Sequence, residues 1–125
     1  MTDSTDPRRG EIWLASLGAA RRGEPGKNRP VMVLSSEELL IGDPGELVVV
    51  VPLSSSVAPS RLRPPIDPSS GIDDDSAAVC RAVRGVARSR LLRHLGEASA
   101  EALADVEGAL ARILGLDRPA APSPA

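Results

Sequence analysis

The 125-residue sequence contains no Phe and no Tyr, and Trp13 is its only tryptophan. Stacking of nucleobases on aromatic side chains is therefore nearly excluded as a way of binding nucleic acid. Cys80 is the single cysteine, which excludes an internal disulfide and fits a reducing compartment. No segment has the apolar core of a signal peptide or the length of a membrane span, so we expect a cytoplasmic protein that does not contact membranes.

Metal ligands and catalytic histidines are also scarce. His94 is the only histidine, so neither a tetrahedral zinc site nor a pair of acid–base histidines can form. The run Asp73–Asp75 beside Gly71 contains hard oxygen ligands, but such a run is more typical of a solvated turn. We therefore predict no metal and no cofactor, and we expect Cys80 to be a small core residue.

The chain has no large excess of positive or negative charge, because its formal net charge is −2. This counts mildly against a nucleic-acid binder, because such proteins are often basic. The basic residues are nevertheless clustered, in residues 8–29 and again in residues 81–93, whereas acidic residues collect at 73–75 and 97–107. A chance distribution of solvated charges would also produce such clusters.

The apolar pattern predicts a mainly β (α+β) domain. Strands are expected at residues 10–17, 30–35, 46–53, 77–87 and 90–96, with a weaker one inside 60–76 and a short helix over 36–42 capped by Ser36. Apolar residues then recur at helical spacing between an N-cap at Ser99 and a C-cap at Gly115. Short strands followed by one amphipathic helix predict a small antiparallel barrel, with disordered tails at 1–7 and 117–125.

The segment GEPGKNRP, residues 23–30, ends with Arg29 at the mouth of a predicted strand. The guanidinium is a planar fork of donors that matches phosphate oxygens, and Pro30 restricts Arg29 to extended conformations. Three serines, Ser54 to Ser56, follow another strand and add hydroxyl donors. An arginine and a hydroxyl together can bind a phosphodiester and stabilise its transition state. From these residues alone, a surface arginine and a strand-ending serine run remain an open alternative.

The blocks RRGEIWLASL, GEPGKNRPVMVLSS, VVVVPLSSS and SAAVCRAVRGVARSRL, followed by a helix ending ILGL, stand in an order that resembles the MazF/PemK family of type II toxin–antitoxin endoribonuclease toxins. The resemblance covers residues 8–116 and implies one domain with the SH3-like, MazF/CcdB-like barrel. It further implies a homodimer that cleaves single-stranded RNA (mRNA, tRNA or rRNA) without a metal. In that reaction a 2′-hydroxyl attacks the adjacent phosphate and leaves a 2′,3′-cyclic phosphate and a 5′-hydroxyl.

The resemblance also implies roles for individual residues. The essential arginine of the family falls on Arg29, and its essential threonine falls on Ser54, whose hydroxyl keeps the donor but lacks the β-methyl group. Many members carry a glutamine where this chain has Ala82, which weakens the transfer of binding detail from that block. The predicted RNA-binding residues are Glu24, Lys27, Ser55, Arg81 and Arg84.

Two other functions remain open from the sequence. The CcdB toxins, which bind DNA gyrase, share this fold, and fold alone does not decide function. A non-catalytic barrel module is the second alternative, and the serine at position 54 leaves it open. The predicted partners of the ribonuclease are its RNA substrate, a cognate antitoxin with an acidic or amphipathic segment, and a second copy of the chain.

Overall fold

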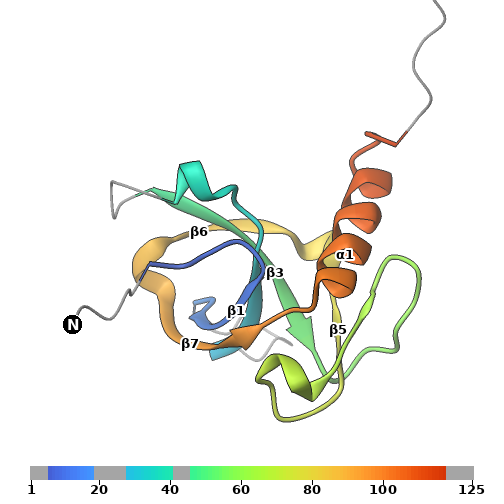
Figure 1. Cartoon of the computed structure of the whole chain (residues 1–125), viewed down its shortest axis with the longest axis horizontal. Helices are drawn as coiled ribbons and strands as arrows, with labels where there is room; N and C mark the ends of the chain where they lie inside the picture. Colours follow the sequence, from blue (N-terminus) through green and yellow to red (C-terminus); the bar gives the residue numbers. More distant parts are fainter. Residues whose placement is uncertain (1–5, 19–27, 41–45, 118–125) are drawn as a thin grey trace, which may run out of the picture.

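Residues 6–18, 28–40 and 46–117 are described by a computed structural model, in which a strongly curved antiparallel sheet carries one helix (Figure 1). The strands are β1 (Glu11–Ser16), β2 (Asn28–Val33), β3 (Leu47–Ser54), β4 (Pro65–Ile66), β5 (Ser76–Ala78), β6 (Arg84–Ala87) and β7 (Leu91–Glu97). The helix α1 spans Ala100–Ile113, and short 3-10 turns lie at Glu37–Leu39, Pro68–Ser70, Cys80–Ala82 and Arg88–Arg90. No helix in these three ranges is long and apolar enough to span a membrane.

Strand β3 is the centre of the sheet. The strand order is β4-β5-β3-β2-β1-β7, and β6 also pairs with β3. One edge of β3 is therefore occupied by β2, and the other edge is shared between β6 and then β5. All of these pairs are antiparallel, so the predicted antiparallel barrel with a terminal helix is confirmed.

Two sequence predictions about local structure were wrong. The helix expected over 36–42 is only the turn Glu37–Leu39 where the chain is described, and the Ser36 side chain makes no capping hydrogen bond. The regions 60–76 and 77–87 are not single strands, because they divide into β4, β5 and β6 with two 3-10 turns between them. Pro64, Pro65 and Pro68 lack the N–H that a longer ladder would need.

The sheet buries an apolar cluster on each face. One cluster joins β1, β2 and β3 to α1 through Ile12, Met32, Val51, Val106 and Ala109. The other lies on the opposite face and includes Trp13, Val31, Val33, Val48 and Val50. Alternate residues of one strand enter different clusters because successive side chains of a strand point to opposite faces.

Helix α1 begins and ends where its sequence predicts. The Ser99 hydroxyl accepts a hydrogen bond from the Ala102 N–H at 3.0 Å, which satisfies one unpaired donor of the first turn. The helix ends at Ile113, and Gly115 then takes a positive φ of 73°. Because Val106 and Ala109 are buried in the first cluster, this helix covers part of that face of the sheet.

Glu11 is a buried carboxylate, 9% exposed, that fixes the start of β1. It accepts hydrogen bonds from the Trp13 indole N–H at 2.9 Å and from the Arg8 backbone N–H at 2.7 Å. The half-exposed ring of His94 on β7 lies 3.3 Å from the other carboxylate oxygen. We expect Glu11→Ala to lower the free energy of unfolding by about 1–3 kcal/mol, because it leaves buried donors unpaired.

Chemical denaturation would measure this change, and Glu11→Gln is the matched control because it keeps an acceptor at the same place. An alanine variant as stable as the parent protein would contradict the prediction.

Cys80 lies in the first cluster and is 0% exposed, as expected for a core cysteine. Burial raises the pKa of its thiol from 9.0 to about 11. In the unfolded chain the thiol therefore ionises at a lower pH than in the folded chain. Between pH 9.0 and about 11 the unfolded state binds fewer protons, so the free energy of unfolding falls as the pH rises.

We expect a thiol reagent to label the folded protein far more slowly than the denatured protein at pH 9.0. Cys80→Ala should reduce the loss of stability above that pH. Equal labelling rates for the folded and denatured protein would contradict this description of the site.

Candidate active site

Strands β2 and β3 bring Arg29 and Ser54 to the same end of the sheet. Val31 pairs with Pro52, Met32 with Val51 and Val33 with Val50. Continuing this register by two residues places Arg29 across from Ser54. Both side chains point to the face of the Val31 and Val50 cluster, since residues two apart in a strand share a face.

Two prolines end the ladder at this point. Pro30 precedes Val31 on β2, and Pro52 on β3 is the partner of Val31. Neither proline carries a backbone N–H that could donate to the ladder. Beyond Pro52, the last residues of β3, Leu53 and Ser54, pair with β5. The two strand ends that hold Arg29 and Ser54 are therefore adjacent but no longer paired with each other, which leaves room for a ligand between them.

A cavity of about 350 Å³ lies between these strand ends, and we call it the Arg29 cavity. Arg29 is half-buried there, so part of its side chain is held by protein while the rest faces the cavity. The lining residues are Asn28, Arg29, Pro30, Leu53, Ser54, Ser55, Ser56, Ile72, Asp73, Asp74 and Ser76. The cavity thus combines a guanidinium with hydroxyl and carboxylate groups.

Ser54 is oriented by its own chain. Its hydroxyl oxygen accepts a hydrogen bond from the Ser56 backbone N–H at 3.1 Å. The oxygen is used as an acceptor, so the hydroxyl hydrogen is available to a ligand in the cavity. This hydrogen bond restrains the side-chain rotamer of Ser54, as the β-methyl group restrains the rotamer of a threonine.

Asp73 and Asp74 are the cavity residues that sequence reasoning missed. The sequence predicts a solvated turn for them, and both are exposed, but they also line the Arg29 cavity. The only sequence signal is their position shortly before Ser76, which begins β5. Because β5 pairs with the end of β3, the turn before it lies beside Ser54.

The other predicted binding residues do not all gather here. Ser55 lines the Arg29 cavity, whereas Arg84 and Arg81 do not. Arg84 pairs with Val50 on β3. Val50 lies four residues before Ser54, so the two positions are about 13 Å apart along the strand. Arg81 lies in the turn Cys80–Ala82, beside Leu62 and the end of α1. Arg81 and Arg84 therefore lie away from the Arg29 cavity, and their role in RNA binding stays a prediction. Glu24 and Lys27 lie outside the described residues.

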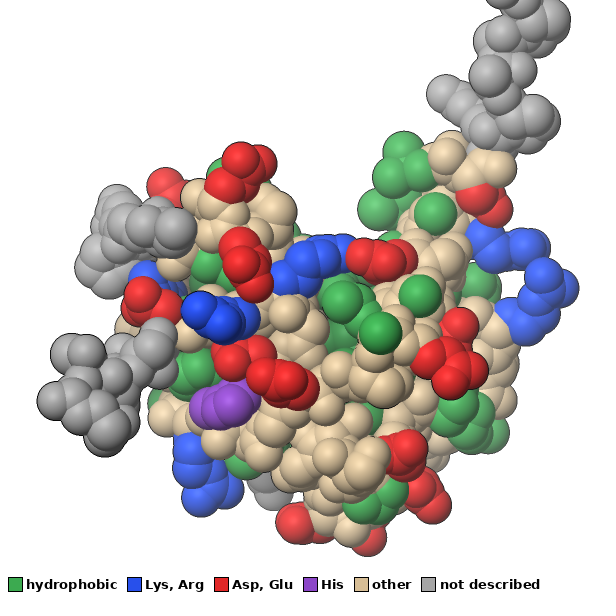
Figure 2. All heavy atoms as spheres, in the orientation of Figure 1, with side chains coloured by type: hydrophobic (Ala, Val, Ile, Leu, Met, Phe, Trp, Pro, Cys, Tyr) green, Lys and Arg blue, Asp and Glu red, His purple; other side chains and the backbone are tan. Residues whose placement is uncertain are grey.

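Charge on the surface is mixed. Figure 2 shows basic and acidic side chains interspersed on one face, with hydrophobic side chains exposed along the helix. Ion pairs join Arg9 to Glu107 and Arg88 to Asp6. Within the parts of the chain that the structure describes, no three His, Cys, Asp or Glu side chains converge to hold a metal ion.

The fold is that of the MazF proteins. The solved structure of MazF (Form-I) from Deinococcus radiodurans matches with a TM-score of 0.75 and 25% identity, over 90% of this chain and 99% of that chain. An endoribonuclease in complex with its cognate antitoxin, from Mycobacterial species, matches with a TM-score of 0.73 and 21% identity, over 90% of this chain and 99% of that chain.

Sequence comparison identifies the family. The profile of the family described as PemK-like, MazF-like toxin of type II toxin-antitoxin system matches residues 8–114. Endoribonuclease MazF9 of Mycobacterium tuberculosis (strain ATCC 25618 / H37Rv) is 33% identical over 111 residues, which cover 82% of this chain and 92% of the relative. The chain therefore belongs to the PemK/MazF family of type II toxin–antitoxin toxins. These findings favour the toxin ribonuclease over the gyrase-binding and non-catalytic alternatives.

Proposed function

We propose that this chain is the toxin of a type II toxin–antitoxin system and a sequence-specific, metal-independent endoribonuclease that cleaves single-stranded mRNA, tRNA or rRNA. Its activity would inhibit translation and growth. The observation that carries the proposal is the convergence of Arg29 and Ser54 on one cavity, at the unpaired ends of two neighbouring strands. The relative named as an endoribonuclease supports the same reaction class.

In this proposal the scissile phosphate lies in the Arg29 cavity. The RNA 2′-hydroxyl attacks the phosphorus, negative charge grows on the non-bridging oxygens, and the bond to the 5′-oxygen breaks. The Arg29 guanidinium donates to those oxygens as their charge increases, and the Ser54 hydroxyl donates to the same group. The products are a 2′,3′-cyclic phosphate and a 5′-hydroxyl.

The proton of the attacking hydroxyl needs an acceptor, and the 5′-oxygen needs a donor. The carboxylates of Asp73 and Asp74 are the acceptors that line the cavity, and either can pass the proton on to the leaving oxygen directly or through water. An arginine such as Arg29 does not act as a base in proteins, because a guanidinium holds its protons too tightly. Its role is therefore electrostatic.

Further contacts with RNA would come from Ser55, from Glu24 and Lys27, and from Arg84 and Arg81, which lie outside the Arg29 cavity. We place this reaction in the cytoplasm, in one domain over residues 8–116.

The proposed partners besides RNA are a cognate antitoxin and a second copy of the chain. Leu47 and Val49, which are 63% and 41% exposed on β3, offer apolar surface for such contacts.

Incubation of the purified protein with total cellular RNA in excess EDTA tests the proposal. We expect discrete new 5′-hydroxyl ends that persist in EDTA, as a metal-independent reaction requires. In Ser54→Ala we expect cleavage to slow about 10- to 100-fold, because one hydrogen bond to a charged group is lost. Ser54→Thr, which keeps the hydroxyl, is the matched control and should retain activity.

Loss of all cleavage in EDTA would contradict the metal-independent mechanism. Full activity of Ser54→Ala would remove Ser54 from the site. A protein without any cleavage activity, together with inhibition of DNA gyrase, would favour the CcdB-like alternative.

A further inference from the structure

Four arginines gather around the last turn of α1, and we call them the arginine surface. They belong to the turn before β4, to the turn Cys80–Ala82 and to α1 itself. They line three cavities, of about 460, 530 and 580 Å³, and each pair of these cavities has one of the arginines in common. Figure 2 shows a group of basic side chains beside α1. The four residues are Arg61, Arg63, Arg81 and Arg112.

The backbone holds part of the arginine surface in place. The turn at Arg61 is closed by two backbone hydrogen bonds between Ser60 and Arg63, at 3.0 and 3.1 Å. The Arg63 side chain also donates from Nε to the Ala58 carbonyl oxygen at 2.9 Å. This bond leaves the two Nη groups of Arg63 to donate to a ligand. The guanidinium groups of this turn are therefore presented from a fixed backbone.

The charge of the arginine surface is not neutralised by neighbouring side chains. All four arginines are exposed, and no ion pair among the described residues involves any of them, whereas Arg9 and Arg88 are both paired. The cavities of about 460 and 580 Å³ have no carboxylate in their lining, and Asp105 and Asp117 line the third cavity. The positive charge of the surface is therefore available to an anionic ligand.

Phosphate is the anion that suits this surface. A guanidinium is a planar fork of donors that matches two phosphate oxygens at once. Ser60, which lines two of the three cavities, adds a hydroxyl donor. The chain has no Phe or Tyr, and Trp13 is buried, so no aromatic platform is available here for stacking a base. The surface therefore fits the backbone of a nucleic acid better than its bases.

The arginine surface lies close to the Arg29 cavity. Val79 lines the cavity of about 460 Å³, and its N–H donates to the Pro52 carbonyl oxygen at 2.8 Å. Pro52 lies only two residues before Ser54 on β3. Ser56 lines the Arg29 cavity and Arg61 follows it by five residues, so their Cα atoms are at most about 18 Å apart. An RNA strand that occupies the Arg29 cavity and continues for a few nucleotides can therefore reach the arginine surface.

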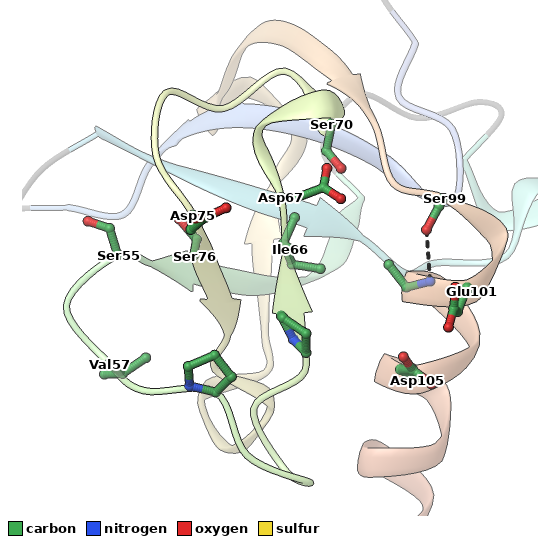
Figure 3. Close-up of a pocket in the computed structure, with 13 residues that line it drawn as sticks. Ser55, Val57, Ile66, Asp67, Ser70, Asp75, Ser76, Ser99, Glu101 and Asp105 are labelled. Atoms are coloured by element: carbon green, nitrogen blue, oxygen red, sulfur yellow. Dashed lines mark hydrogen bonds between the residues drawn. The ribbon is translucent and has the colours of Figure 1, made fainter.

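An acidic region separates the two sites. A further cavity, of about 600 Å³, shares lining residues with the Arg29 cavity and with the cavity of about 530 Å³. Carboxylates repel phosphates, so the part of an RNA backbone that crosses this region stays in solvent. A short RNA that fills only the Arg29 cavity therefore does not reach the arginine surface, whereas a longer one does. Figure 3 shows the carboxylates that line this region, which belong to Asp67, Asp75, Glu101 and Asp105.

We propose that the arginine surface binds the phosphate backbone of RNA outside the cleavage site and so anchors long RNA to the protein. This inference rests on the proposed ribonuclease function. Backbone contacts carry no sequence information, so the surface raises the affinity for any long RNA and leaves the choice of the cut position to the Arg29 cavity. Each arginine that neutralises a phosphate releases counterions. The binding of long RNA therefore depends more steeply on salt than the binding of short RNA.

Binding of 2′-O-methyl oligouridine, which lacks the attacking hydroxyl, tests the inference without cleavage. A short and a long probe, of about four and about sixteen nucleotides, span the usual site sizes for single strands. Fluorescence anisotropy gives the slope of the logarithm of the binding constant against the logarithm of the salt concentration. For the long probe, Arg61→Ala and Arg112→Ala should each reduce that slope by about 0.7, and the double variant by about 1.4. For the short probe, the slope should stay that of the parent protein.

Arg93→Ala is the matched control, because it removes an equal charge from an exposed position on β7 and should leave both slopes unchanged. Circular dichroism shows whether each variant is folded. Arg61 lies at the exposed tip of a turn, so its single variant carries the test if the double variant does not fold.

Cleavage of RNA by the parent protein separates this inference from the proposed function. If the parent protein cuts RNA but the variants keep its slope for the long probe, the inference is wrong and the ribonuclease stands. The inference is equally wrong if the variants lose only the binding of a polyglutamate peptide, which would assign the surface to an acidic protein segment. If the slopes fall as expected but no RNA is cut, the proposed function is wrong and the backbone-binding surface stands.

Discussion

Arg29→Ala is expected to reduce RNA cleavage about 100- to 1,000-fold, the usual cost of removing a donor that stabilises transition-state charge. The guanidinium is the only cationic group that lines the Arg29 cavity among the described residues, so no neighbour there replaces it. We expect the fold to be unaffected, because the residue is half-buried at the end of β2 and takes no part in either apolar cluster. Single-turnover cleavage of a mapped RNA site measures the effect.

Two further variants separate charge from geometry. Arg29→Lys keeps the charge but loses the planar fork, and we expect activity between those of the parent protein and of Arg29→Ala. Arg93→Ala removes an equal charge from an exposed position on β7 and should leave the rate nearly unchanged. Near-normal cleavage by Arg29→Ala would overturn the assignment of the site.

Gly71→Ala and Gly96→Ala are each expected to destabilise the protein by about 3 kcal/mol or more, through overpacking against backbone and, at Gly71, backbone strain. The turn after β4 lies directly against β7. A Cβ atom at Gly71 would overlap the Leu95 carbonyl oxygen, and one at Gly96 would overlap the Ser70 carbonyl oxygen. Gly71 also has a φ of 98°, which disfavours any L side chain.

Gly108→Ala is the matched control, and it is expected to change the stability in the opposite direction. Gly108 lies within α1, and a Cβ atom there would meet nothing within 4 Å. Alanine is favoured over glycine in a helix by about 1 kcal/mol, so this variant should be more stable than the parent protein. Thermal or denaturant unfolding of the three variants measures the contrast, and equal effects at Gly71 and Gly108 would show that close approach to β7 does not limit the fold.

Much of the fold could be predicted from local patterns. The continuous apolar run around Val48 to Val51 predicted a strand, and β3 is the central strand, with Val50 and Val51 in different clusters, although Val49 is exposed. The helical spacing after Ser99 placed α1 with its cap. The region from residue 60 to residue 87 was predicted poorly, because its strands are short and are defined by their partners on β3 and not by their own sequence.

The candidate active site was likewise only partly predictable from the sequence. Arg29 and Ser54 could be named from the sequence because proline fixes the backbone beside one and a strand ends at the other, and the resemblance to a toxin family pointed to the same pair. The contribution of Asp73 and Asp74 could not, because these residues reach the Arg29 cavity only when β5 pairs with the end of β3.

The sequence by itself determined the residue types available for chemistry: an aliphatic core, no aromatic platform, one cysteine, one histidine, and an arginine and a serine at strand ends. Only the tertiary structure decided which of these groups meet. It brought Arg29 and Ser54 into one cavity and left Arg81 and Arg84 outside it. The physical reason is that composition and local pattern limit what each segment can form, whereas distances between segments follow from strand register and from how α1 covers the sheet.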